Sequence, residues 1–182
     1  LKVDSLLEIP KGAIIKDLKG DYIYPSFIDL YSNYGLSEVK KDAYNYRVQY
    51  ETNKDGAYHW NEAIHPEINA CEEFVVNKKH AKEYLSSGFG VVLSHKQDGI
   101  VRGTAALVSV SNEKEQKCII SQKAASVFSF KKGLSKQKYP SSLMGSIALI
   151  RQLFLDADWH ERSSSKTNLS YNAFNNQSDL PH

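Results

Sequence analysis

The first part of the chain alternates between short apolar runs and chain breaks. Residues 13–18 are mostly β-branched or apolar, and residues 22–24 resume the pattern after a Lys-Gly-Asp break. Pro25 ends that piece, and residues 27–31 form another apolar and aromatic run. Runs of this length and composition, bounded by glycine and proline, are typical of short β-strands. We therefore predict strands at these three places.

The middle of the chain changes to a helical period and then returns to strands. Residues 77–87 favour a helix that ends at Gly88. The compact apolar run at 89–95 is typical of a strand buried on both faces. A helix, a glycine and an apolar strand in this order form half of a βαβ unit. Residues 104–110 and 117–120 predict further strands, separated by a polar turn.

The clearest helix is predicted to begin near Ser141, after Pro140 and a pair of serines. Apolar residues then recur at spacings of four and three, which gives one apolar stripe: Leu143, Ile147, Ile150, Phe154 and Ala157. Two polar segments frame these elements. Residues 36–60 are tyrosine-rich and predict a loop or insertion, and residues 163–182 predict a polar linker or loop.

Composition limits the class of protein. The chain has 182 residues and is 41% hydrophobic, so it can bury a core and is not a disordered chain. A net charge of +2, carried mostly by lysine, argues against a nucleic-acid binder. No apolar run approaches the ~18 residues of a membrane-spanning helix. The two cysteines, Cys71 and Cys118, lie too far apart for a CxxC motif.

The sequence contains no strong local motif for nucleotide binding, catalysis or metal binding. Gly88 and Gly90 lack the third glycine of a dinucleotide-binding loop, and no serine lies in a GxSxG elbow. A group of titratable residues could be considered as metal ligands: His59, Glu62, His65 and Glu67. The spacing of the two histidines and the intervening Pro66 favour a polar surface segment instead. From these residue types alone, no catalytic arrangement is predicted.

Two parts of the chain nevertheless resemble a known family. Residues 12–29, which end in Pro-Ser-Phe-Ile-Asp, resemble the entry to the amidohydrolase superfamily barrel, where a β-sandwich hairpin ends in a pattern like P-G-F-I-D. Residues 88–92, 99–104, 129–133 and 139–149 resemble bacterial imidazolonepropionase-like amidohydrolases. The resemblance covers most of residues 5–35 and 85–160.

One departure from the family pattern concerns the metal site. In the family, the aspartate is followed by His-x-His, which binds the catalytic metal, whereas Tyr31-Ser32-Asn33 stands here. Residues two apart on a strand point to the same side, roughly 6.5–7 Å apart, so two imidazoles could share one Zn²⁺. A neutral phenol and an amide are weak substitutes. We therefore expect no metal in this chain at Tyr31 and Asn33, and we expect both residues to suit hydrogen bonding to a substrate.

The resemblance implies an α/β fold: a partial (β/α)₈ amidohydrolase-type barrel preceded by short strands of a small β-sandwich. The expected division is sandwich strands at 1–24, the first part of the barrel at 25–162, and a polar linker or loop at 163–182. Complete barrels take about 250 residues, which implies the front fragment of a longer protein.

The function implied by the resemblance is that of a hydrolase acting on amide or cyclic-amide C–N bonds of a small molecule, with a divalent metal such as zinc in the parent family. The fragment is expected to be inactive by itself and to associate with the remainder of its parent or with itself. The alternative is a non-catalytic amidohydrolase-like binding or assembly domain.

Overall fold

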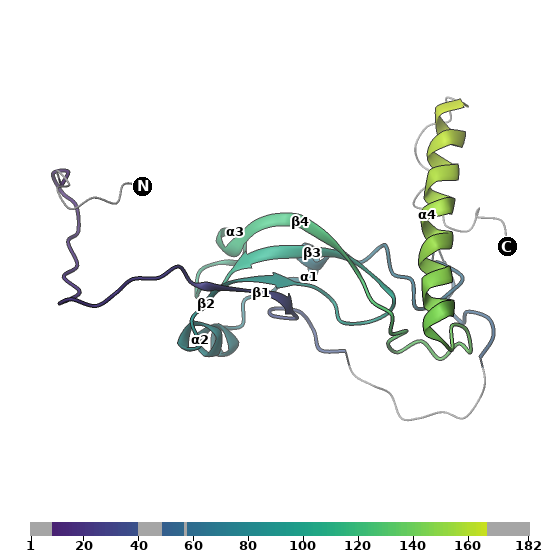
Figure 1. Cartoon of the computed structure of the whole chain (residues 1–182), viewed down its shortest axis with the longest axis horizontal. Helices are drawn as coiled ribbons and strands as arrows, with labels where there is room; N and C mark the ends of the chain where they lie inside the picture. The colour runs from purple at the N-terminus through teal and green to yellow at the C-terminus, as the bar shows by residue number, and fades with distance from the viewer. Residues whose placement is uncertain (1–8, 40–48, 57, 167–182) are drawn as a thin grey trace.

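A computed structural model describes residues 9–39, 49–56 and 58–166 of the chain (Figure 1). Four strands form one sheet in the order β1-β2-β3-β4. In chain order the elements are β1 (Phe27–Ser32), α1 (Ala70–Glu73), α2 (Lys78–Ser86), β2 (Phe89–Ser94), β3 (Val101–Ser109), α3 (Glu115–Cys118), β4 (Ile119–Phe128) and α4 (Leu143–Lys166). The described residues thus form a mixed α/β fold.

The sheet combines one parallel pair with two antiparallel pairs. Strand β1 runs parallel to β2, with Phe27 opposite Phe89 and Ser32 opposite Ser94. Parallel neighbours need a crossover between them, and α2 lies in that crossover immediately before β2. The pairs β2–β3 and β3–β4 are antiparallel. The helix, glycine and apolar strand at 77–95 predicted half of a βαβ unit, and the parallel pairing of β1 with β2 confirms this prediction.

Helix α2 begins and ends where its sequence predicts. The side chain of Asn77 accepts hydrogen bonds from the backbone N–H groups of Lys79 and His80, which would otherwise lack acceptors in the first turn. At the other end, Gly88 adopts a φ of +86°, a left-handed conformation that glycine enters at little cost. The helix therefore ends at Ser86, and Ser87 and Gly88 connect it to β2.

Helices α1 and α2 pack on one face of the sheet. Ala70 of α1, Ala81 of α2, and Val92 and Val108 of the sheet belong to one buried cluster. The rest of that cluster is Tyr34, Phe74, Ala106, Val110 and Cys118. The hydroxyls of Ser32 and Tyr84 are joined by a hydrogen bond of 2.8 Å, which ties β1 to α2. The well-packed part of the molecule is this helix-covered face.

The other face of the sheet is less covered than the sequence suggested. Along β2, Val92 and Ser94 are buried, but Phe89, Val91 and Leu93 are only half-buried. The prediction of a strand buried on both faces was therefore wrong for β2. The reason is that, among the described residues, the helices in contact with β2 lie on one side.

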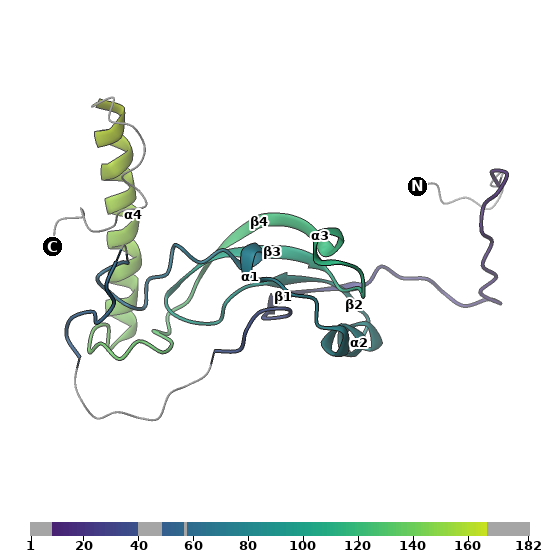
Figure 2. The same cartoon turned by 180° about the vertical axis from the view of Figure 1, so that it is seen from behind.

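The predicted strands at 13–18 and 22–24 are absent: residues 9–26 contain no strand. In Figures 1 and 2 this segment extends away from the sheet. Ile14 is 98% exposed and Tyr22 is 85% exposed. A strand needs a neighbour for its N–H and C=O groups, and no described residue pairs with this segment. β-propensity alone was therefore insufficient, while residues 1–8 lie outside the described range.

The later elements also differ in extent from their predictions. Strand β4 covers residues 119–128, not 117–120, and a short helix, α3, occupies the start of the predicted run. The more polar middle of β4, Ser121 to Ser126, is held as a strand by pairing with β3. Helix α4 begins close to Ser141 as predicted but continues to Lys166, so the predicted linker at 163–182 begins as helix. Residues 167–182 lie outside the described range.

The predicted loop at 36–60 contains no helix or strand in its described residues, 36–39, 49–56 and 58–60. Residues 40–48 and 57 of that loop lie outside the described range.

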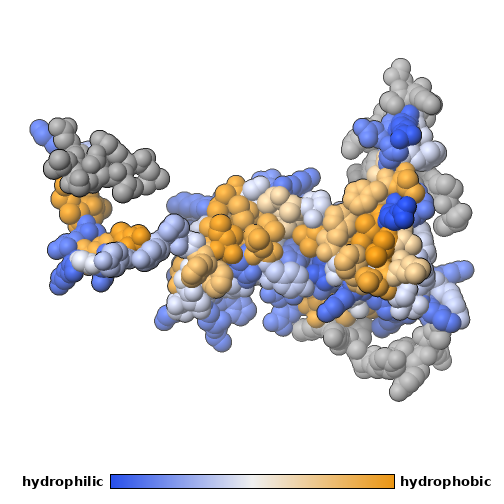
Figure 3. Space-filling model, viewed as in Figure 1, coloured by the Kyte–Doolittle hydropathy of each residue, from blue (hydrophilic) through white to orange (hydrophobic). Residues whose placement is uncertain are grey.

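Helix α4 contacts one end of the sheet, where Leu149 packs with Val101 and Phe154 lies against Phe128, and its far end projects beyond the sheet in both views (Figures 1 and 2). Leu149 is buried at 4% exposure, whereas Leu143, Ile147 and Phe154 of the predicted apolar stripe are 59%, 41% and 58% exposed. Figure 3 shows apolar surface along the lower part of α4 and over the sheet. None of the helices within the described residues is long and apolar enough to cross a membrane.

Candidate functional site

Three side chains meet where β1 and β2 end and β3 begins. Because β1 and β2 are parallel, their carboxyl ends lie at the same edge of the sheet, and the antiparallel β3 starts there. Tyr31 comes from the end of β1, His95 directly follows β2, and Arg102 is the second residue of β3. We call these three residues the strand-end cluster. In parallel α/β sheets, ligands bind outside the carboxyl ends of strands, so this edge is the place to look for a site.

Tyr31 contacts both other members of the strand-end cluster. Nη1 of Arg102 donates a hydrogen bond of 3.2 Å to the Tyr31 hydroxyl, and the guanidinium carbon lies 5.9 Å from the centre of the Tyr31 ring. The His95 ring meets the Tyr31 ring edge-on, with centroids 5.0 Å apart. Tyr31 is itself 61% exposed, so the cluster is reached from solvent on the Tyr31 side.

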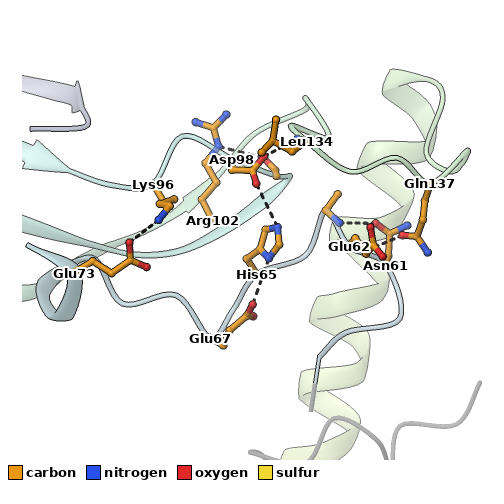
Figure 4. Close-up of polar contacts among 12 residues, drawn as sticks. Asn61, Glu62, His65, Glu67, Glu73, Lys96, Asp98, Arg102, Leu134 and Gln137 are labelled. Atoms are coloured by element: carbon orange, nitrogen blue, oxygen red, sulfur yellow. Dashed lines mark hydrogen bonds and ion pairs between the residues drawn. The ribbon is translucent and has the colours of Figure 1, made fainter. Parts of the chain in front are cut away.

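Arg102 is buried at 5% exposure, which is rare for an arginine that lacks a carboxylate partner. Its Nε donates to the backbone carbonyl of Gly99 at 3.1 Å. Within the described part of the chain it forms no ion pair. In Figure 4 its guanidinium points away from His65 and the acidic residues around that histidine. The cluster therefore contains a positive charge that forms no ion pair with a carboxylate of residues 9–39, 49–56 or 58–166.

His95 is buried at 1% exposure, and neither of its ring nitrogens has a hydrogen-bond partner among the described residues. Burial lowers the pKa of His95, and the positive charge of Arg102 lowers it further, while the nearby backbone of Leu93 and the charge of Asp29 oppose the shift. A neutral imidazole carries one N–H donor and one acceptor nitrogen. The strand-end cluster thus offers a guanidinium, a phenol and an imidazole with unused hydrogen-bonding capacity.

Tyr31 and Asn33, the two predicted substrate-binding residues, lie in different surroundings. Strand β1 ends at Ser32, and its pairing with β2 is irregular between Asp29 and Ser32. Asn33 is exposed and begins a turn, in which its carbonyl accepts from the N–H of Leu36 at 3.0 Å. It borders a hollow of about 940 Å³ beside the start of α2. Tyr31 instead faces His95 and Arg102, two residues that sequence reasoning did not select.

The missed residues had only weak signals in the sequence. His95 ends the apolar run 89–95, and Arg102 lies in the segment 99–104 that carries the family resemblance. A lone histidine or arginine near a strand end does not reveal whether it is buried. Their burial depends on the pairing of β3 with β2, which brings Arg102 to the carboxyl end of β1.

A second polar cluster surrounds His65 and is structural (Figure 4). Nδ1 of His65 lies 3.3 Å from Glu67, and Nε2 lies 3.9 Å from Asp98. Asp98 also accepts from the backbone N–H of Leu134 at 2.7 Å. These contacts fix the segment before α1 against the loop that follows β2.

The prediction of a polar surface segment at this place was partly wrong. His59 and His65 are 6% and 7% exposed, and burial lowers the pKa of His59. Glu62 lies closer to the surface, and its carboxylate accepts from Gln49, Thr52 and Asn53. Gln137 accepts from the N–H of Glu62 at 2.7 Å, which holds the segment from the other side. Within the described residues no group of three or more His, Cys, Asp or Glu side chains could hold a metal ion.

No family model and no curated protein matches this chain. Among solved structures, the chain is similar to the crystal structure of an amidohydrolase from Thermotoga maritima MSB8, with a TM-score of 0.66 and 24% sequence identity. The likeness covers 93% of this chain and 43% of that chain. The chain thus has the fold of part of an amidohydrolase, as the resemblance implied, and it spans less than half the length of that structure.

Tyr31 and Asn33, which stand where the family pattern has its two metal-binding histidines, do not fit a divalent metal. Tyr31 and Asn33 offer a phenol and an amide in place of two imidazoles. The guanidinium of Arg102, whose nitrogen lies 3.2 Å from the Tyr31 hydroxyl, would repel a second cation at that oxygen.

Proposed function

We propose that this chain is part of an amidohydrolase-type hydrolase acting on amide or cyclic-amide C–N bonds. The observation that carries the proposal is the fold likeness to an amidohydrolase over 93% of the chain. The parallel β1–β2 pair gives the chain the strand-end edge at which such barrels bind substrates. Tyr31 and Asn33 are the substrate-binding residues in this proposal.

The chain is proposed to be inactive by itself. Activation of water needs a metal or a positioned base, and the strand-end cluster instead centres on an arginine. The exposed apolar residues of α4 and the exposed edge strand β1 are proposed to pack against the remainder of a barrel or against a second copy.

A second candidate is a non-catalytic amidohydrolase-like binding or assembly domain. It is favoured by the hydrogen bond between Arg102 and Tyr31, because the position of the family's first metal-binding histidine is then occupied by a residue paired with a permanent cation. A binding domain needs the shape and charge of that edge but not a nucleophile.

One set of measurements tests the proposal. The full chain is incubated with a panel of cyclic amides, with and without added zinc, and is also analysed for bound metal. We expect no turnover and no stoichiometric metal. Metal-dependent turnover by a monomer, with a metal that Tyr31→Ala removes, would overturn the inactive-fragment proposal. Turnover only after the missing barrel part is added would favour the hydrolase over the binding domain.

A further inference from the structure

The strand-end cluster contains more unused hydrogen-bonding capacity than a purely structural site requires. Arg102 has five N–H donors, of which the described contacts use one on Nε and one on Nη1. Both ring nitrogens of His95 lack hydrogen-bond partners in the part of the chain that the structure describes, although the ring is 1% exposed. Buried polar groups without partners destabilise a fold, so their presence together points to a ligand.

We infer that the strand-end cluster of Tyr31, His95 and Arg102 binds the carboxylate of a small-molecule ligand. This rests on the proposed substrate-binding role of Tyr31 and adds the chemical class of the group that is bound. A guanidinium matches a carboxylate because its planar fork of N–H groups faces two oxygens at once.

The contacts of Tyr31 suit it as the second donor. Its oxygen accepts from Nη1 of Arg102 at 3.2 Å, which leaves the phenol's own proton without a described acceptor. A carboxylate oxygen beside that phenol could accept this proton while the other oxygen meets the remaining N–H groups of Arg102. Because Tyr31 is 61% exposed, such a ligand can approach without displacing buried residues.

The charge of the cluster favours a singly charged anion. Arg102 supplies one positive charge, and Asp29, whose carboxylate accepts from the Tyr31 N–H at 2.9 Å, reduces the positive potential nearby. The buried His95 is neutral near pH 7 and contributes a dipole, not a second charge. A phosphate, with a charge of about −1.5 to −2 at neutral pH, is less well matched.

The test is a titration of the full chain with N-acetylglycine, its neutral isostere N-acetylglycinamide, and inorganic phosphate. Binding is followed by NMR of the His95 ring, whose resonances are assigned with His95→Gln. We expect N-acetylglycine to bind at millimolar concentrations. The affinity of the amide should be lower by about tenfold or more. Equal binding of the two, no binding of either, or tighter binding of phosphate would overturn the carboxylate assignment.

Substitutions at Arg102 and Tyr31 test whether the carboxylate binds at the strand-end cluster. Arg102→Gln is expected to weaken N-acetylglycine binding about tenfold or more. Arg102→Lys keeps the charge but loses the fork, so we expect an intermediate loss, and Tyr31→Phe should weaken binding a few-fold. Arg151→Gln removes an exposed arginine from α4 and should leave binding unchanged.

Each variant also gives a result that contradicts the inference. Unchanged binding in a folded Arg102→Gln would overturn it, with circular dichroism as the check on folding. If Arg102→Gln does not fold, Arg102→Lys and Tyr31→Phe decide: wild-type affinity in both would overturn the inference. Cleavage of N-acetylglycine would appear separately, as acetate and glycine resonances, so a failure of hydrolysis and a failure of carboxylate binding are distinguishable.

Discussion

The helix-covered sheet and the N-terminal segment contain similar apolar residues, but these residues are buried in the sheet and exposed in the segment. In the sheet, Val92 and Val108 are fully buried beneath α1 and α2. In the segment 9–26, Ile14 and Ile15 are 98% and 71% exposed. The amino acids are β-branched and apolar in both places. The difference shows that burial is set by whether the fold supplies a second surface, and not by the hydrophobicity of the segment alone.

Helix α4 contains both situations on one element. Leu149 is 4% exposed and packs with Ile64, Ile100 and Val101, whereas Leu155, further along the helix, is 61% exposed. The following substitutions test whether the contrast in burial is also a contrast in free energy.

The largest difference in the free energy of unfolding is expected between substitutions of a buried and an exposed isoleucine. Ile100→Ala removes a fully buried side chain and should lower the free energy of unfolding by about 2–5 kcal/mol. Ile14→Ala should change it by no more than about 0.5 kcal/mol, because that side chain is 98% exposed. Urea unfolding of both variants measures the difference. Similar losses for the two would mean that the N-terminal segment is packed in solution.

A smaller difference is expected within α4. Leu149→Ala should lower the free energy of unfolding by about 2 kcal/mol, the lower end of the range for such changes, because Leu149 belongs to the smaller of the two buried clusters of the described residues. Leu155→Ala is the matched control and should be nearly neutral. Circular dichroism in urea measures both. A loss at Leu155 equal to that at Leu149 would show that the outer side of the helix is covered.

The buried histidines should make stability depend on pH. Burial lowers the pKa of His59 and His95 in the folded chain, so below the unfolded pKa of ~6.5 the unfolded state binds more protons. The free energy of unfolding should therefore fall as the pH is lowered from 7 to 5, above the range where most carboxylates titrate.

Two histidine variants test this pH dependence, one at a buried histidine and one, as the control, at an exposed histidine. His95→Gln should flatten the slope, whereas His80→Gln, which changes an exposed histidine of α2, should not. A slope unchanged in His95→Gln would contradict the prediction.

The smallest effect on stability, but a measurable one on association, is expected at the exposed side of α4. The double change Leu143→Ser and Leu155→Ser should alter the free energy of unfolding by less than about 1 kcal/mol, since both side chains are more than half exposed. If the chain self-associates through this surface, as proposed, light scattering should show a lower mass for the variant. Ala148→Ser on the same helix is the control. An unchanged associated mass in the double variant would exclude this surface.

The sequence could predict elements whose signals are local. Helix α2 was predictable because Asn77 and Gly88 mark its ends. The parallel pairing of β1 and β2 was predictable because a helix lies between these two strands in the sequence. The amidohydrolase-like fold followed from motif resemblance. The true length of β4 was not predictable, because residues 121–126 are strand only through pairing with β3.

The candidate site was predicted in part. Tyr31 was selected from its position after Asp29 and does lie at the strand-end edge. Its partners could not be predicted, because His95 and Arg102 reach it only through the register of three strands. Proximity across a sheet depends on pairing that single-residue patterns do not contain.

The parallel strand β1 has a consequence for the order of folding. The residues of β2 with which it pairs lie far along the chain, as the pairing of Phe27 with Phe89 shows. In contrast, β2, β3 and β4 are consecutive antiparallel strands. Closing a long loop costs more entropy than closing a hairpin, so the three-stranded meander should form first and β1 should dock last. In the native protein the same difference should appear as faster amide hydrogen exchange in β1 than in β3. Because Tyr31 belongs to β1, the strand-end cluster would be assembled only when this last strand docks.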